Sequence, residues 1–220
     1  MFTGIVEEIG EIVARTPRGP GARLTIACTF DDLALGDSVC VGGVCLTVDA
    51  IDDGGGRGKK DDGKTRFEID ATAETLERST IKHLNVGTSV NLERALKPSS
   101  RMGGHYVVGH ADGIGHLVSK SPVGEATSMR FSIPLELSRF VAQKGSIAVD
   151  GVSLTTNTVG KDSFDVVLIP HTLRRTTLGA LAVGDEVTIE VDLLARYVAR
   201  QLGFDGAPSF EQKLRDGGFL

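Results

Sequence analysis

Short runs in which apolar and polar residues alternate dominate the chain. Large apolar residues recur at every second position in the segments 38–48, 66–71, 89–95, 128–134, 163–170 and 186–192. A period of two over a short run is typical of strands with one buried face. The pattern therefore predicts an all-β chain of short strands, joined at stretches that contain Gly and Pro.

Helical patterns are confined to a few segments. Short helices are expected at 73–80 and 173–181, which match each other, and at 134–145. The longest helical pattern follows residue 192, and Gly203 can end that helix. Its apolar stripe consists of Leu193, Leu194, Tyr197, Val198 and Leu202. Such a stripe has to be buried, so it either packs on its own chain or joins the helices of partner copies as an oligomer seam.

The strand pattern occurs twice. Segments 4–13, 38–48, 66–80 and 86–95 match, in the same order, segments 109–118, 146–156, 163–177 and 183–192. The first copy carries an extra stretch, GGGRGKKDDGK (54–64), which is Gly-rich and charged, and we interpret it as a mobile hairpin tip without chemistry. Two copies of about ninety residues, each with about six short strands, predict two small antiparallel barrels, because closure removes exposed sheet edges.

This repeat divides the chain into three expected parts. The first barrel takes 1–97, the second takes 98–192, and the helix with its tail takes 193–220. The linker at 95–105 is rich in Pro, Ser and Gly, as expected of a boundary.

Charge and cysteine content exclude several classes of protein. The net charge of −5 gives no electrostatic footprint for nucleic acid or for an acidic membrane. No apolar run approaches the roughly 18–20 residues that span a bilayer, and the first residues lack the pattern of a signal peptide. Three cysteines, Cys28, Cys40 and Cys45, form no CxxC pair, which argues against a disulfide framework or a zinc site. We expect a protein of the reducing cytoplasm.

One loop sequence stands in both copies, as GGVCLTV at 42–48 and as DGVSLTT at 150–156. The two versions place Cys45 and Ser153 at the same position. Taken alone, Cys45 is typical of a small buried hydrophobe, and Ser153 is typical of a turn hydroxyl that bonds to the backbone.

Three histidines and one aspartate are further candidates. His105, His110 and His116 suggest a metal cluster, but on one strand His105 and His110 would lie on opposite faces, so we expect no metal site. Asp192 precedes the C-terminal helix and, taken alone, is an ordinary helix N-cap.

Five motifs together carry a family resemblance: MFTGIVEEIG (1–10), GVCLTV (43–48), GGHYVVGHADG (103–113), DGVSLTT (150–156) and IPHTLRRTTLG (169–179). With these motifs in order over residues 1–198, the chain resembles the riboflavin synthase family of the α-chain type, a family of lumazine-binding double barrels. The resemblance implies two tandem, similar six-stranded antiparallel Greek-key barrels and a C-terminal helix that forms a homotrimer. Association with lumazine synthase is implied for some organisms.

The resemblance also implies a reaction. Two molecules of 6,7-dimethyl-8-ribityllumazine exchange a four-carbon unit and give riboflavin and 5-amino-6-ribitylaminouracil, with no redox cofactor and no metal. Because two copies of one ligand react together, the enzyme needs two similar pockets, which explains the repeat. Holding both reactants face to face lowers the barrier by up to roughly 7–11 kcal/mol. In the family, the N-terminal barrel of one subunit faces the C-terminal barrel of its neighbour.

A flat heterocycle is well held by backbone N–H and C=O groups, and small residues such as Gly4 and Gly109 let that backbone come close. The resemblance carries the family's ligand positions over to a longer set of residues. These expected substrate contacts are Phe2, Gly4, Ile5, Val6, Cys45, Leu46, Thr47, Asp70, Ala71, Thr72, Gly109, His110, Ala111, Lys144, Ser153, Leu154, Thr155, Ile169, Pro170, His171, Thr172 and Leu173.

The expected catalytic residues are Cys45, His110, Ser153, Asp192 and Ser38. We expect Cys45 and Ser153 to touch equivalent ring edges in separate pockets, and His110 to shuttle protons, because imidazole titrates near neutrality. Asp192 is expected to act as a base or an orienting group. The carry-over is weaker for Ser38 and Phe2.

Two other functions stay open. Some relatives keep both barrels but only hold a lumazine or flavin, for instance as a light emitter, and they lose parts of the second site or the helix. A barrel module for protein contacts would bind no lumazine and would leave the duplicated loops unexplained. At Gly42 the chain departs from the family, in which Asn often precedes the turn glycine. The sequence does not indicate which barrel holds the donor.

Overall fold

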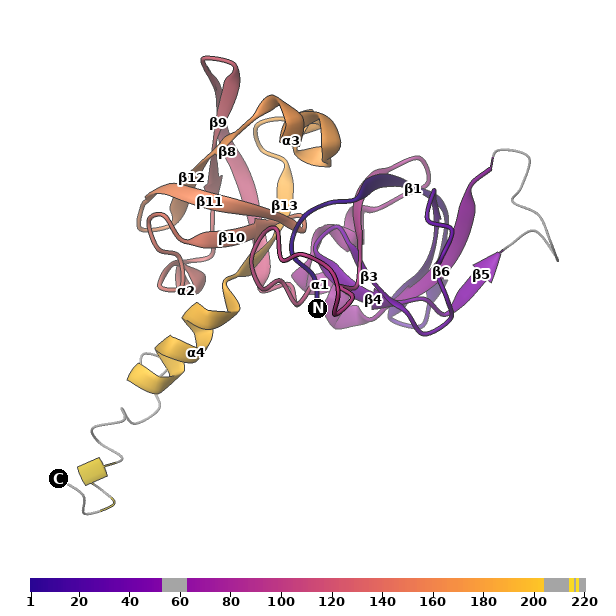
Figure 1. Ribbon diagram of the computed structural model, residues 1–220, viewed down its shortest axis with the longest axis horizontal. Coiled ribbons are helices and arrows are strands. Elements are labelled where there is room, and N and C mark those ends of the chain that lie inside the picture. Colours follow the sequence, from indigo (N-terminus) through magenta and orange to yellow (C-terminus); the bar gives the residue numbers. More distant parts are fainter. Residues whose placement is uncertain (53–62, 204–213, 216, 218–220) are drawn as a thin grey trace.

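The computed structural model describes residues 1–52, 63–203, 214–215 and 217, and the hairpin tip expected at 54–64 lies almost wholly outside them. Two β-barrels follow one another along the chain, and one helix extends from the second (Figure 1).

The first barrel is a sheet with the strand order β4-β3-β7-β1-β2-β6-β5. Its strands are β1 (Glu8–Arg18), β2 (Gly21–Cys28), β3 (Ser38–Val41), β4 (Val44–Thr47), β5 (Ala50–Asp52), β6 (Thr65–Ala71) and β7 (Ser89–Arg94). The strands at the two ends of this order, β4 and β5, are separated in the chain only by Val48 and Asp49. The Asp49 N–H donates to the Glu68 carbonyl on β6 at 2.9 Å, so this short connection links the two ends of the sheet.

The second barrel is closed, with the strand order β10-β11-β12-β9-β8-β13. Its strands are β8 (Gly113–Val123), β9 (Ala126–Ser132), β10 (Ser146–Val149), β11 (Val152–Val159), β12 (Ser163–Leu168) and β13 (Glu186–Val191). The single strand β11 corresponds to β4 and β5 together. Both barrels are therefore of the six-stranded type, which confirms the predicted fold class.

Short helices stand at equivalent places in the repeats. They are α1 (Ala73–Arg78) with η1 (Thr80–His83), and α3 (Pro170–Arg175) with η2 (Thr177–Ala180). The helix expected at 134–145 is only α2 (Leu135–Ser138), so that prediction was too long. After Ser138 the backbone continues in turns, in which the Phe140 N–H donates to the Leu137 carbonyl and the Val141 N–H to the Ser138 carbonyl. Lys144, with a φ of 63°, lies in the turn just before β10.

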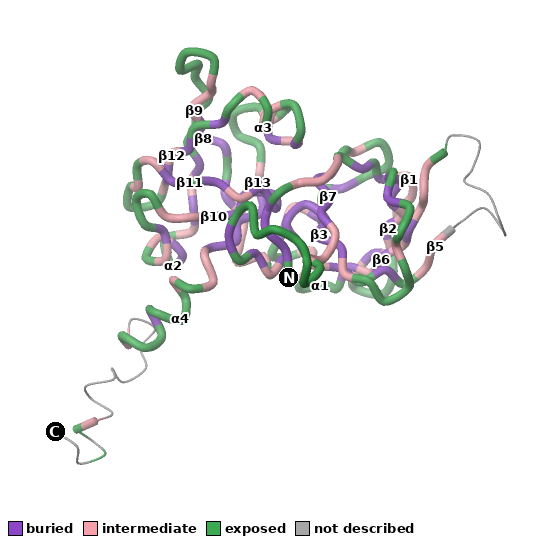
Figure 2. The backbone as a smooth tube through the Cα atoms, in the orientation of Figure 1, coloured by how far each residue is buried: buried purple, intermediate pink, exposed green. Residues whose placement is uncertain are grey.

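Each barrel encloses its own apolar core. Ile12, Leu24 and Phe67 are fully buried in the first, and Phe131 and Phe164 stack at 5.7 Å between ring centroids in the second. A third, smaller cluster of Phe2, Cys40, Val107 and Ala148 lies between them. Figure 2 shows buried backbone both inside the barrels and where they meet.

The C-terminal helix α4 (Leu193–Leu202) projects away from both barrels (Figure 1). Asp192 caps it by accepting the Leu194 N–H, and Gly203 ends it in the left-handed conformation with φ 76°, as predicted. Most of its apolar stripe is uncovered: four side chains are more than half exposed, namely Leu194, Tyr197, Val198 and Leu202. Of the two burial modes that the sequence allows, packing on its own barrels is therefore not the one observed. No helix in the described ranges is long and apolar enough to cross a bilayer.

Candidate functional site

The two related loops form matching β-hairpins. Gly42–Gly43 joins β3 to β4 with φ values of 53° and 88°, and Asp150–Gly151 joins β10 to β11 with φ values of 46° and 79°. Positive φ at both central residues defines the type I′ turn, whose twist fits the flanking strands. Cys45 pairs with Cys40, and Ser153 pairs with Ala148, in identical registers. Cys45 and Ser153 are therefore structurally equivalent.

The alternation of β4 and β11 divides the predicted residues between two faces. Leu46 and Leu154 belong to the two cores, so their side chains point away from a ligand on the outer face. Cys45 and Ser153 are half-buried on the outer face, and the threonines two residues later are exposed there. Cys45 and Ser153, which are expected to carry the chemistry, therefore lie on this outer face and not in the cores.

The segment before the first strand of each barrel crosses to the other barrel. The Gly4 carbonyl accepts the Ser153 N–H at 2.8 Å, and the Gly109 carbonyl accepts the Cys45 N–H at 2.8 Å. Val6 packs on the second core, and Ala111 packs on the first. Each candidate pocket is therefore built from both repeats, which the sequence did not predict.

Only glycine fits at the two crossing points. Gly4 and Gly109 both have a φ of 74°. A Cβ atom would lie 2.6 Å from the Ser153 Cβ at Gly4, and 2.7 Å from the Cys45 Cβ at Gly109. The close approach of backbone to strand therefore requires glycine at both points.

Ser153 contacts His105, a residue that the sequence pattern suggested only as a metal ligand. His105 Nδ1 lies 2.7 Å from Ser153 Oγ, and His105 Nε2 is buried without a partner among the described atoms. Burial lowers the pKa of His105, and the nearby Asp192 charge raises it by less, so the imidazole is neutral at pH 7. His105 belongs to the linker and is far from β11 in the sequence. No periodic pattern in the sequence therefore predicts its contact with Ser153.

Two weaker candidates lie at the edges of this arrangement. Phe2 is fully buried between the barrels, and Cys45 packs against its cluster. Ser38 begins β3 opposite Thr47. Phe2 therefore packs on the same outer face of the first barrel as Cys45, and Ser38 lies on β3, the strand next to that of Cys45.

Asp70 and Lys144 have partners other than Cys45 and Ser153 among the described residues. Asp70 pairs with Arg23 at 2.9 Å and with Arg18 at 2.6 Å, and these arginines lower the Asp70 pKa. The segment 70–72 lines a separate hollow of about 240 Å³. Lys144 is exposed, and its Nζ lies 3.3 Å from Asn157 Oδ1.

The predicted wall at 169–173 forms the start of α3. Ile169 is exposed at its N-cap, Pro170 is its first residue, and Leu173 packs on the second core. His110 is exposed at the mouth of a hollow of about 60 Å³ that Glu190 and Arg196 also line. Ile5 lines a larger cavity of about 480 Å³ beside the Ser153 crossing. The Ser153 side therefore has space into which a ligand can enter.

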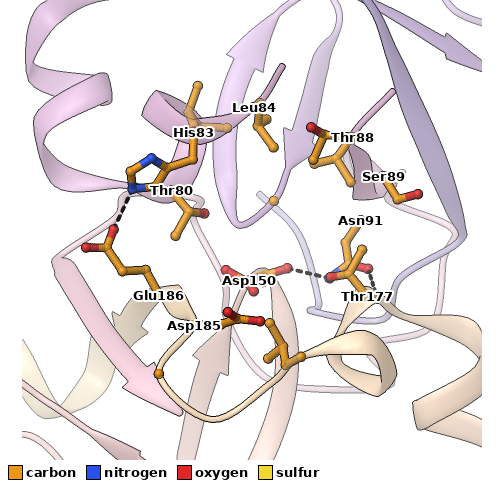
Figure 3. Close-up of a pocket in the computed structure, with 15 residues that line it drawn as sticks. Thr80, His83, Leu84, Thr88, Ser89, Asn91, Asp150, Thr177, Asp185 and Glu186 are labelled. Carbon is orange, nitrogen blue, oxygen red and sulfur yellow. Dashed lines mark hydrogen bonds and ion pairs between the residues drawn. The ribbon is translucent and has the colours of Figure 1, made fainter. Parts of the chain in front are cut away.

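A cavity of about 530 Å³ lies between the barrels and contains none of the predicted residues among its described lining (Figure 3). Asn91 spans it: its Nδ2 donates to the Asp150 carbonyl at 2.9 Å, and its Oδ1 accepts the Thr177 N–H at 2.8 Å. His83 Nε2 lies 2.8 Å from Glu186 at the rim. These contacts tie the two repeats together, and we interpret this cavity as part of the barrel interface.

No group of three His, Cys, Asp or Glu side chains with metal-binding geometry occurs in the described ranges.

The model of the lumazine binding domain matches the chain twice, at residues 3–95 and 108–192. The riboflavin synthase of Mycobacterium tuberculosis is 46% identical over 206 residues, which cover 91% of this chain and 97% of that protein.

The chain belongs to the riboflavin synthase family. The family member of Brucella abortus is 44% identical over 202 residues, covering 91% of this chain and 97% of its own, and that of Bacillus subtilis is 37% identical over 204 residues, covering 92% and 90%. These matches confirm the resemblance found in the sequence motifs.

The fold also resembles solved structures of LumP. LumP complexed with 6,7-dimethyl-8-(1'-D-ribityl) lumazine superposes with a TM-score of 0.73 at 23% identity, covering 87% of this chain and 99% of that one. LumP complexed with riboflavin gives the same TM-score at 24% identity, with the same coverage. At this identity the likeness establishes the double-barrel fold.

Proposed function

We propose that this protein is a riboflavin synthase, a transferase that converts two molecules of 6,7-dimethyl-8-ribityllumazine into riboflavin and 5-amino-6-ribitylaminouracil. The observation that carries this proposal is the pair of crossed, equivalent hairpin positions at Cys45 and Ser153 in a chain of this family. Two pockets of one design fit a reaction between two copies of one ligand, because both copies need the same recognition.

The Ser153 pocket has the means for acid–base chemistry. The neutral imidazole of His105 can accept the Ser153 proton across their 2.7 Å contact. Ser153 Oγ can then add to an electron-poor ring carbon, or relay a proton to the reacting ligands. Asp192 lies near enough to favour the imidazolium that forms, which supports an orienting role for this carboxylate.

The Cys45 pocket has different chemistry at the equivalent position. A thiol is in general more nucleophilic than a hydroxyl. The exposed His110 follows Gly109 directly and is the nearest candidate for a proton shuttle in this pocket. This difference fits two ligands with different roles, one giving and one receiving the four-carbon unit.

The exposed stripe of α4 supports self-association, and we propose a homotrimer because the family resemblance implies one. Leu194, Tyr197 and Val198 would be covered if three copies brought their helices together, and pockets of adjacent copies could then face each other. The three free cysteines are consistent with a cytoplasmic location, which we include in the proposal.

The direct test is incubation of the purified protein with 6,7-dimethyl-8-ribityllumazine. The proposal predicts one riboflavin for every two lumazines consumed, together with one molecule of the pyrimidine. A binding protein of the same fold, the second candidate that the likeness to LumP favours, would bind the lumazine and leave it unchanged. That result would overturn the enzyme proposal and keep the family assignment.

A further inference from the structure

Two buried carboxylates stand at equivalent places in the repeats and have no part in the proposed chemistry. Glu93 lies on β7 and Glu190 lies on β13, with exposures of only 6% and 3%. Burying a carboxylate is unfavourable unless hydrogen bonds or opposite charges compensate. What these two groups bind is therefore informative.

Both carboxylates bind the backbone of the crossing segments. Glu93 accepts the N–H groups of Thr3 at 2.7 Å and Gly4 at 2.9 Å, and also the Thr3 hydroxyl at 2.7 Å. Glu190 accepts the N–H groups of Val108 at 2.8 Å and Gly109 at 2.9 Å. Each glutamate therefore holds the segment that precedes the first strand of its own barrel and contacts the other barrel.

The same two glycines continue the connection to the pockets. Gly4 bonds to Glu93 through its N–H and to Ser153 through its carbonyl, and Gly109 does the same between Glu190 and Cys45. One residue therefore separates each carboxylate from a pocket strand of the opposite barrel. Each glutamate is well placed to set the position of that strand's outer face.

We propose that Glu93 and Glu190 are crossed positioning residues: Glu93 of the first barrel holds the Ser153 pocket, and Glu190 of the second barrel holds the Cys45 pocket. The backbone part of this inference is independent of the reaction, and its effect on ligand binding rests on the proposed function.

Conversion to glutamine tests the proposal with little change of shape. One acceptor oxygen becomes an NH₂ donor, which faces a backbone N–H, so one hydrogen bond is lost and two donors oppose each other. Glu186→Gln is a matched control, because Glu186 lies on the same strand as Glu190 but pairs with Lys82 and His83 at the surface.

Peptide-resolved hydrogen exchange provides the first readout. We expect Glu190→Gln to speed exchange in the segment around Cys45 about tenfold and to leave the segment around Ser153 unchanged. We expect Glu93→Gln to do the reverse, and Glu186→Gln to change neither. Equal changes in both segments, or a change only in the variant's own barrel, would overturn the crossed arrangement.

Labelling of Cys45 with 5,5′-dithiobis(2-nitrobenzoate) provides the second readout, since Cys28 and Cys40 are buried and Cys45 is half-exposed. Only Glu190→Gln should change the labelling rate severalfold, and only this variant should weaken protection of Cys45 by riboflavin. If riboflavin does not bind the wild-type protein, the proposed function fails, whereas the exchange pattern still decides the positioning role.

A milder variant covers the case in which Glu93→Gln does not fold. Thr3→Val removes the Thr3 hydroxyl bond to Glu93, together with the weaker bond that this hydroxyl accepts from the Ile5 N–H at 3.2 Å, and keeps both backbone bonds to Glu93. We expect it to speed exchange around Ser153 two- to threefold and to leave the Cys45 segment unchanged. No change at Ser153 would contradict the role of Glu93.

Discussion

His105 Nδ1 lies 2.7 Å from Ser153 Oγ, so a residue of the linker between the barrels directly contacts the outer face of the second one. The contact gives one of two equivalent positions an acid–base partner. With the imidazole as its base, the Ser153 hydroxyl can act as a nucleophile at neutral pH, whereas a serine without a base is a weak nucleophile.

The Ser153–His105 pair predicts coupled losses of activity. Ser153→Ala and His105→Gln should each lower kcat about 10²–10⁴-fold, and the double variant should lose little more than the worse single variant, because the two groups act together. Initial rates of riboflavin formation measure this. His116→Gln, on the exposed side of β8, is the control and should retain activity.

The pH dependence separates catalysis by His105 from a packing role. Since burial lowers the His105 pKa below 6.5, wild-type activity should fall only when the pH drops through that lowered pKa and the ring gains a proton. His105→Gln should lack this acid limb. An unchanged acid limb in the variant would assign it to another group.

Cys45 provides the next prediction. Cys45→Ser, which copies the second repeat, and Cys45→Ala should both reduce turnover, with alanine worse because it removes all polarity. The control is Cys28→Ala, because burial raises the Cys28 pKa to about 11 and keeps it an inert thiol in the core; this variant should lose stability but not activity. If both Cys45 variants turn over normally, Cys45 has no chemical role.

The crossing glycines predict a steric effect on stability. Gly4→Ala should lower the free energy of unfolding by about 3 kcal/mol or more, because its Cβ collides with Ser153 in addition to the strain of positive φ. Gly124→Ala has similar strain, with a φ of 59°, but meets open space, so it should cost about 1 kcal/mol. Urea unfolding of both variants checks the difference. Equal losses of stability in the two variants would mean that Gly4 is less closely packed against Ser153 than in this structure.

Asp150 predicts how stability changes with pH. Burial raises its pKa from 3.8 to about 7, so the folded chain holds this proton more tightly than the unfolded chain does. The free energy of unfolding should therefore fall as the pH rises from about 4 to about 7. Asp150→Asn keeps an acceptor for the Thr188 N–H and should reduce this slope. It should not abolish the slope, because burial also raises the Glu190 pKa to about 7.

Much of the fold could be predicted from two features of the sequence. The alternation of apolar and polar residues is local along the chain, and the repeat aligns the two halves directly. The strand runs, the equivalence of Cys45 and Ser153, and the cap and end of α4 all follow from nearby residues. The crossing of 4–6 and 109–111 could not be predicted, because alternation fixes the face of a residue and not the barrel that it joins. The contact of His105 was missed for the same reason.

We propose that the repeat provides two pockets for two copies of one heterocycle. Isothermal titration with a ribityllumazine analogue that lacks the 7-methyl group measures this directly, because the analogue cannot complete the reaction. We expect two bound molecules per chain, with one lost in Gly109→Ala and the other lost in Gly4→Ala. Binding of only one molecule per chain, which one of these substitutions leaves unchanged, would contradict the proposal of two pockets.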